Sequence, residues 1–137
     1  ALEGTSLGIP SIAFSLDTSG EELNFTLAAE WAVRIARLVM RKGLPKGVLL
    51  NVNFPAGVPK GVRVTRLSTH HWEDTVVERL DPEGRPYYWI AGTPVGEEEE
   101  GTDLHAVRHG YISITPVSLD FTAADLLAEV ARWVEEV

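Results

Sequence analysis

The sequence contains no cysteine, no glutamine and one methionine, and only three of its 137 residues are asparagine. Without cysteine the chain has no disulfides, no thiolate zinc site and no cysteine nucleophile, so carboxylates, histidines, hydroxyls and amides must carry any chemistry. The scarcity of residues prone to thermal damage predicts a thermophilic source. Nine arginines against three lysines add little to this expectation, because the proteome-wide trend in thermophiles favours lysine and glutamate.

Long apolar runs and basic clusters are also missing. No run approaches the roughly 18 apolar residues that span a bilayer, and the first residues do not resemble a signal peptide, so we expect a cytoplasmic protein. The net charge of -8 argues against nucleic-acid duplexes such as DNA and against anionic membranes as partners, because phosphate backbones are held mainly by Lys and Arg. If the chain handles phosphate, a bound cation or backbone donors must balance the charge.

The residues that are present indicate a single domain over 1–137, because a chain of this length with 45% hydrophobic residues can bury a core. We expect it to be built around a buried strand, Val48–Pro55. One face of this strand is apolar throughout, and the other becomes polar at Asn51 and Asn53. Ligands of open α/β sheets bind at the carboxyl ends of strands, which makes these amides candidate substrate-binding groups. The other interpretation is that they hydrogen-bond to neighbouring loops.

A strand, a helix and a strand follow one another in the first 55 residues. Ile9–Leu16 is a predicted buried strand, and Asn24 is a favourable N-cap for a helix over Phe25–Lys42. The polar residues of this helix form one narrow solvent stripe in which Glu30 and Arg34 can pair, and we expect every other position to face protein. The stripe comprises Glu30, Arg34, Arg37 and Arg41, and the expected core residues are Trp31, Ile35, Leu38 and Val39. This order predicts a βαβ unit with parallel strands, and Ala1–Ser6 resembles the end of a helix.

The character of the chain changes after a further predicted strand, Gly61–Leu67. Trp72–Leu80 and Arg85–Ala91 are rich in β-forming residues and are joined by the turn signal Asp-Pro-Glu-Gly, so we predict a hairpin arm over 72–91. A lone hairpin is only marginally stable, so we expect this arm to pack on another subunit; the alternative is that it folds back onto its own domain. A terminal helix over Ala123–Val137, with Thr122 and Asp125 as a capping-box variant, makes 122–137 a second oligomerisation segment.

Candidate polar residues lie between these two segments. Thr102 and Asp103 can cap a short helix that carries His105 and His109, ahead of a strand over Tyr111–Pro116. The two histidines have the spacing of half a metal site, but no glutamate follows the first of them as in zinc proteases, and the preceding glutamate run lacks the spacing of a calcium loop. A serine hydrolase built from Ser15 with Asp103 and His105 would lack any supporting motif.

Four blocks of sequence, in the same order, resemble the SurE family of stationary-phase survival proteins. They are Ala-Leu-Glu-Gly-x-x-Leu-Gly-Ile-Pro-Ser-Ile-Ala (1–13), Leu-Asn-Val-Asn-Phe-Pro (50–55), Gly-Val-Arg-Val-Thr-Arg (61–66) and Gly-Thr-Asp…Gly-Tyr-Ile-Ser-Ile-Thr-Pro (101–116). The resemblance implies a three-layer α/β/α Rossmann-like fold. It also implies a phosphatase that depends on a divalent metal, Mg or Mn, and acts on nucleoside 5'-monophosphates and sometimes on polyphosphate. It further implies dimers or tetramers in which a hairpin arm and a C-terminal helix are exchanged.

The family's metal ligands lie in its amino-terminal half, in segments that this sequence does not contain, so the resemblance assigns no metal ligand and no catalytic residue to this chain. Thr102 and Asp103 belong to a family block, and we expect them near the phosphate pocket of the complete enzyme. We therefore expect the carboxy-terminal part of a nucleotidase that is inactive alone; the alternative is a non-catalytic oligomerisation module without a metal site.

Overall fold

Four strands form the central sheet of the computed structural model, which describes residues 1–18, 25–69, 71–95 and 99–136. The strands lie in the order β1 (Ile12–Leu16), β2 (Val48–Phe54), β6 (Ile112–Ser118) and β3 (Val62–Val64). β1 and β2 are parallel, as the βαβ order predicts, whereas β6 runs antiparallel to β2 and parallel to β3. The sheet is therefore mixed, and the carboxyl ends of β1 and β2 meet the start of β6.

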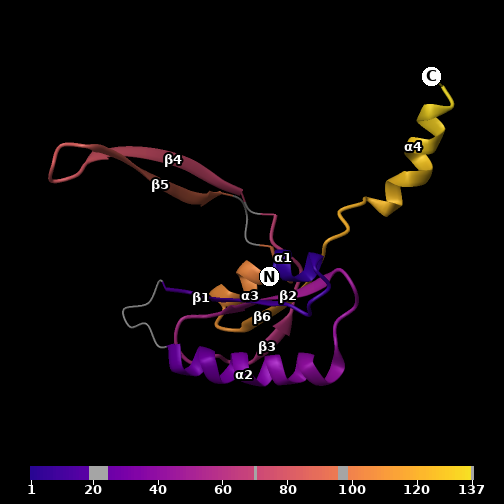
Figure 1. The fold of residues 1–137 in the computed structure, drawn as a ribbon, viewed down its shortest axis with the longest axis horizontal. Helices are drawn as coiled ribbons and strands as arrows, with labels where there is room; N and C mark the ends of the chain where they lie inside the picture. Colours follow the sequence, from indigo (N-terminus) through magenta and orange to yellow (C-terminus); the bar gives the residue numbers. More distant parts are fainter. Residues whose placement is uncertain (19–24, 70, 96–98, 137) are drawn as a thin grey trace.

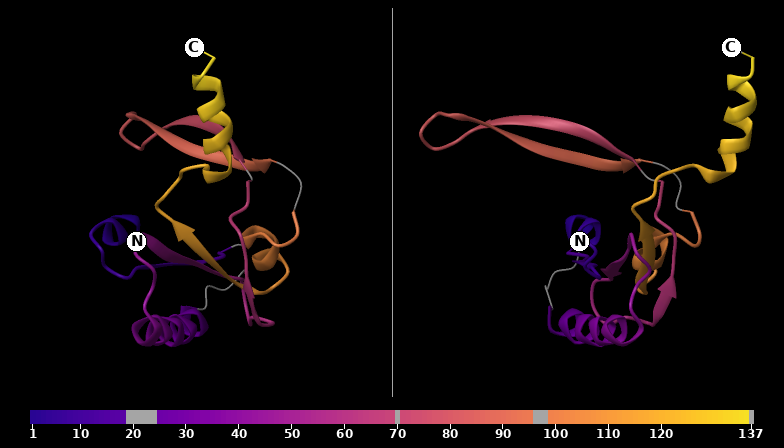
Figure 2. Two further views of the ribbon diagram at one scale, coloured as in Figure 1. Left: turned by 90° about the vertical axis from the view of Figure 1, so that its right-hand side faces the viewer. Right: turned by 45° about the vertical axis from the view of Figure 1, so that its right-hand side comes forward.

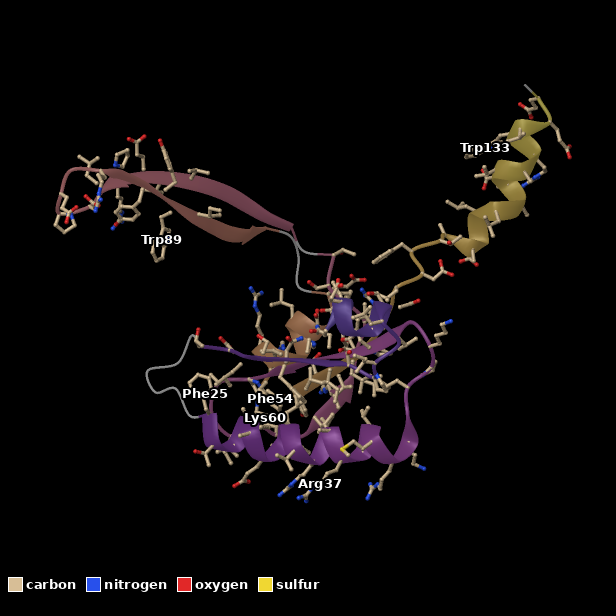
Figure 3. The ribbon with its side chains drawn as sticks, in the orientation of Figure 1. Phe25, Arg37, Phe54, Lys60, Trp89 and Trp133 are labelled. Atoms are coloured by element: carbon tan, nitrogen blue, oxygen red, sulfur yellow. The ribbon has the colours of Figure 1, made fainter. Side chains whose placement is uncertain are left out.

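The long helix α2 (Phe25–Lys42) covers one face of this sheet (Figure 1). Val52 and Phe54 of β2 and Ile112 of β6 are almost fully buried beneath it and pack with Ile35. Figure 3 shows Phe54 directed from the sheet towards α2, while Arg37 points away on the far side of the helix. The apolar face predicted for the central strand is thus confirmed as the core face.

Two short helices, α1 (Leu2–Ser6) and α3 (Asp103–Arg108), lie on the opposite face, so the chain has three layers (Figure 1). Leu49 is buried on this second face, where Asn51 and Asn53 follow it along β2. This layer is small because both helices are short. This face therefore carries the half-buried polar groups considered below.

The hairpin of β4 (His71–Leu80) and β5 (Pro86–Val95), called the arm, projects from one end of the sheet (Figures 1 and 2). The turn residue Gly84 has φ +82°, and its N–H donates to Asp81 O at 2.9 Å. Asp81 also accepts hydrogen bonds from Arg85 N and Glu83 N, which lower the pKa of its carboxyl. The predicted hairpin and its turn are confirmed, with β5 extending four residues beyond Ala91 to Val95.

The chain ends in a 3-10 turn, η1 (Ala124–Leu126), followed by α4 (Leu127–Val134), which also stands away from the sheet (Figure 2). The predicted capping box at Thr122 and Asp125 is wrong, because neither helical segment has a side-chain cap. The Thr122 N–H instead donates to Asp120 Oδ1 at 3.0 Å, and hydrogen bonds from the Thr122 side chain and from this N–H lower the pKa of Asp120. The segment before α4 is therefore a turn closed by Asp120 rather than a capped helix start.

The expectation that α2 buries everything outside its polar stripe is also wrong. Ile35 and Val39 are buried, but Val33, Leu38 and Met40 are exposed by 49%, 46% and 84%. A sheet of four strands covers only one side of the helix, so these apolar side chains have no neighbouring layer within the described residues. The predicted pair of Glu30 with Arg34 does not form there either, because Arg34 lies over the Trp31 ring, 5.2 Å from its centroid. The predicted cap Asn24 lies outside the described residues.

No helix in the described ranges combines the length and the apolar character needed to cross a bilayer.

Candidate functional site

A row of polar residues crosses all four strands on the thinly covered face of the sheet. Ser15 of β1 pairs with Asn53 of β2, Asn53 pairs with Ser113 of β6, and Ser113 pairs with Arg63 of β3. Paired residues of neighbouring strands project to the same face of a sheet. We call these four residues the polar row; it runs along the carboxyl ends of the parallel strands β1 and β2, where α/β sheets bind ligands.

A second set of polar residues lies on the same face of the sheet, two residues along the chain from the members of the polar row. Asn51 pairs with Ala13 and with Thr115. The hydroxyl of Thr65 lies 2.8 Å from Ser113 Oγ and 2.7 Å from Thr115 Oγ1, and all three of these hydroxyl residues are buried. The sequence analysis missed this hydroxyl cluster, because the residues are 48 and 50 positions apart and meet only through the pairing of β3 with β6.

The side-chain amides of Asn51 and Asn53 are half-buried, yet neither makes a hydrogen bond within the described part of the chain. No side-chain polar atom is fully buried without a partner among these residues, so both amides retain contact with solvent. The interpretation that they hydrogen-bond to neighbouring loops therefore finds no support. Two unused amides at the carboxyl end of a central strand are available to a ligand.

Arg63, at the other end of the polar row, stacks on an aromatic ring instead of pairing with an acid. Its guanidinium carbon lies 3.8 Å from the centroid of the Tyr111 ring. Gly61 lies against the same ring, where an added Cβ would be 3.6 Å from two of its carbon atoms. This stacking holds the guanidinium against Tyr111, the residue just before β6, at the β3 side of the sheet.

Thr102 and Asp103 lie away from the polar row, at the point where the segment before β4 and the segment after β5 meet the sheet. The Arg66 N–H donates to Gly101 O at 3.1 Å, and the Asp103 N–H donates to Arg66 O at 2.9 Å. Asp103 Oδ1 accepts from Ser68 N at 2.8 Å, and buried Thr102 caps α3 by accepting from His105 N at 3.3 Å. These contacts join the segment before β4, at Arg66 and Ser68, to the segment after β5, at Gly101 and Asp103.

An ion pair strengthens the same junction. The Arg66 guanidinium contacts the Glu99 carboxylate, and this hydrogen bond lowers the pKa of Glu99. Gly101 has φ +83°, a conformation that L side chains rarely adopt, and it turns its carbonyl towards Arg66 N. We call this group the arm root; its members are Arg66, Ser68, Glu99, Gly101, Thr102 and Asp103.

The structure does not bring the four predicted site residues into one cluster. Thr102 bridges Arg66, which continues from β3, so it lies at the edge of the sheet furthest from β1. In the sheet, β6 and β3 lie between it and the strand that carries Asn51 and Asn53, although α3, which Thr102 caps, packs against β6 and β2. The predicted cap of α3 by Thr102 is confirmed. The expected nearness of Thr102 and Asp103 to a phosphate pocket stays a prediction.

The described residues do not contain a metal centre. None of their His, Asp or Glu side chains form a group of three or more that could hold an ion. The His105 and His109 rings stack on one another with centroids 4.1 Å apart, and His109 Nδ1 lies 2.8 Å from His105 O. Hard divalent cations need several oxygen ligands, so the groups present do not fit the metal that the family resemblance implies. Residues 96–98 of the acidic loop lie outside the described residues.

The serine-hydrolase arrangement has no geometric support. Ser15 lies on β1, at the opposite edge of the sheet from the arm root that contains Asp103. The Asp103 carboxylate accepts from Ser68 N and Leu104 N, not from a histidine. Within the described chain, no hydrogen bond joins Ser15 to either proposed partner.

A mixed sheet with a long helix on one face, short helices on the other and polar groups at the strand ends defines a three-layer α/β/α protein with a Rossmann-like sheet. The chain belongs to the SurE family, because the family described as "Survival protein SurE" matches residues 1–74. The sequence resemblance to this family is thereby confirmed.

Relatives and a solved structure extend the match over the whole chain. The chain is 72% identical over 137 residues to "5'-nucleotidase SurE 1" of Thermus thermophilus and 51% identical over 135 residues to "5'-nucleotidase SurE" of Deinococcus radiodurans. A crystal structure of a SurE protein from Aquifex aeolicus superposes with a TM-score of 0.74 at 40% identity, covering 98% of this chain. The chain spans 55% of the Thermus protein, 50% of the Deinococcus protein and 55% of the Aquifex chain. It matches their carboxy-terminal part.

Proposed function

We propose that this chain is the carboxy-terminal part of a phosphatase that hydrolyses nucleoside 5'-monophosphates, with polyphosphate as a further substrate. The observation that carries the proposal is the 72% identity, over the whole chain, to a protein named a 5'-nucleotidase. The polar row supports it, because the side chains of Ser15 and Asn53 make no hydrogen bond within the described residues and lie where α/β sheets bind ligands.

The complete enzyme would hold Mg or Mn through residues upstream of this chain. The described residues offer no carboxylate cluster, and a net charge of -8 makes phosphate capture by this chain alone unfavourable. Asn51 and Asn53 would contribute neutral hydrogen bonds to the substrate.

Phosphate release by the complete protein tests the proposal. With Mg or Mn present, we expect release from nucleoside 5'-monophosphates and loss of activity on metal removal by EDTA. Inorganic phosphate is measured against a control without enzyme. Failure to release phosphate from any 5'-monophosphate with either metal would contradict the proposed function.

We also propose that the protein forms homo-oligomers, dimers or tetramers, through the arm and α4. Both faces of the arm carry exposed apolar side chains, with Ile90 and Tyr88 on one face and Trp89 on the other, each more than 60% exposed. Figure 3 shows that Trp89 on the arm and Trp133 on α4 lie far from the sheet. Large apolar surfaces of this kind are typical of interaction sites.

The second candidate function is a non-catalytic assembly module. One observation favours it: the chain carries two projecting apolar segments but no metal cluster among its described residues. The two functions differ in their expected result for the complete protein. An assembly module would form oligomers and release no phosphate, whereas a nucleotidase would do both.

Asp103→Ala in the complete protein is expected to lower kcat/KM for a nucleoside monophosphate several-fold. The substitution removes the acceptor for Ser68 N, which loosens the arm root and the adjacent Thr65 hydroxyl cluster. Hydrogen bonds to charged groups contribute about 1.5–3 kcal/mol, so the free energy of unfolding should fall by a similar amount. Steady-state kinetics and denaturant unfolding measure the two effects.

Asp103→Asn is the matched control, because the amide retains an acceptor oxygen for Ser68 N. We expect it to keep most of the activity and stability. An unchanged kcat/KM in Asp103→Ala would show that the arm root has no influence on the site.

A further inference from the structure

The outer half of the polar row consists of Ser15 and Asn53, and neither side chain stabilises the fold through a hydrogen bond within the described chain. Ser113, at its inner end, is fully buried and bonded to Thr65, so that half is satisfied internally. Ser15 and Asn53 are adjacent partners in the β1–β2 register, yet neither side chain makes a hydrogen bond within the described residues. Ser15 is exposed and Asn53 is half-buried. A hydroxyl and an amide thus lie side by side, open to solvent.

The chemistry of this pair restricts what it can bind. A serine hydroxyl and an asparagine amide are neutral, and each both donates and accepts hydrogen bonds. Neutral hydroxyls and amides can donate to phosphate oxygens, but the strong phosphate contacts come from cations or from converging backbone N–H groups. The nearest basic residue of the row, Arg63, lies two strands away from Asn53, roughly 10 Å at the usual strand spacing, and stacks on Tyr111. The pair therefore suits sugar hydroxyls better than it suits phosphate.

We propose that Ser15 and Asn53 bind the ribose hydroxyls of the substrate, and so orient the nucleoside while the phosphate lies elsewhere. This inference rests on the proposed nucleotidase function and assigns a specific part of the substrate to this chain. The hydroxyl of Ser15 and the amide of Asn53 each form one neutral hydrogen bond to the sugar. Ser15, for which no sequence motif supports a catalytic role, is assigned a binding role because of its partner on β2.

The test compares Ser15→Ala and Asn53→Ala in the complete protein on substrates with and without a sugar. For a ribonucleoside 5'-monophosphate we expect kcat/KM to fall about 3- to 10-fold in each variant, the effect of one neutral hydrogen bond. For p-nitrophenyl phosphate, which has no sugar, kcat/KM should remain unchanged. Competitive inhibition by the free nucleoside, which has no phosphate, should weaken by the same factor.

Ser11→Ala is the matched control. Ser11 lies four residues before Ser15, immediately before β1, and its hydroxyl donates to Ile9 O at 2.9 Å. We expect this variant to retain wild-type kinetics with both substrates.

The outcomes separate this inference from the proposed function. A wild-type protein that does not hydrolyse the ribonucleoside 5'-monophosphate contradicts the proposed function, and the inference with it. A wild-type nucleotidase whose variants lose activity equally on both substrates, or on neither, leaves the proposed function intact but contradicts sugar binding. Unchanged inhibition of Asn53→Ala by the nucleoside would also contradict sugar binding, and this result depends on binding of the nucleoside and not on its hydrolysis.

Discussion

The 137 residues alone are expected to release no phosphate from nucleoside monophosphates or p-nitrophenyl phosphate, and the loss should be complete rather than partial. Metal catalysis requires a cation held in fixed geometry beside an open coordination position. The described residues provide no group of three or more acidic or histidine side chains in reach of one another. The surrounding fold cannot replace missing ligands, because neutral amides and hydroxyls hold a hard cation weakly without carboxylates.

The measurement compares the fragment with the complete protein under the same conditions, with Mn or Mg and then with EDTA. The complete protein should be active with the metal and inactive after chelation. Circular dichroism of the fragment shows whether it retains its helices and strands. Turnover by the folded fragment that disappears with EDTA would reveal a metal site within this chain and overturn the expectation.

Removal of the arm is expected to lower the oligomer mass of the complete protein. In the monomer, Ile90 is 76% exposed on one face of the hairpin and Trp89 is 63% exposed on the other. A two-stranded ribbon has no core of its own, so contact with another copy is the simplest way to cover both faces. Deletion of residues 75–85 removes most of β4 and the turn, and light scattering measures the change in mass.

A point substitution separates loss of contact from misfolding. Ile90→Lys places a charge on the surface of the arm and should reduce the oligomer mass without lowering the stability of a monomer in which this side chain is exposed. Val58→Lys is the matched control, because Val58 is 79% exposed in the loop after β2. Retention of the full mass in both the deletion and Ile90→Lys would show that the arm makes no intersubunit contact.

Local patterns were sufficient to predict most of the elements. The helix Phe25–Lys42 is confirmed over its predicted bounds, because its apolar spacing and the Gly43 that follows it are both local signals. The alternating residues of Val48–Phe54 predicted a strand with one buried face, and the Asp-Pro-Glu-Gly turn predicted the hairpin. Each of these features depends on residues within a few positions of one another.

Burial of the helix could not be predicted in the same way. The pattern on α2 indicates which side is apolar but not how much sheet lies beside it, so Met40 and Val33 were expected to be covered and are exposed. Likewise, Thr122 and Asp125 have the spacing of a capping box, but Asp120 closes the preceding turn and α4 begins later.

The sequence by itself determined the fold class, the family and the candidates Asn51, Asn53, Thr102 and Asp103, because motifs and periodicity are written along the chain. Only the tertiary structure decided which of these residues lie together. Strand pairing placed Asn53 beside Ser15 and joined Thr65 to Ser113 and Thr115, and it moved Thr102 and Asp103 to the arm root. The register between strands depends on contacts between residues tens of positions apart, and a local pattern cannot specify such contacts.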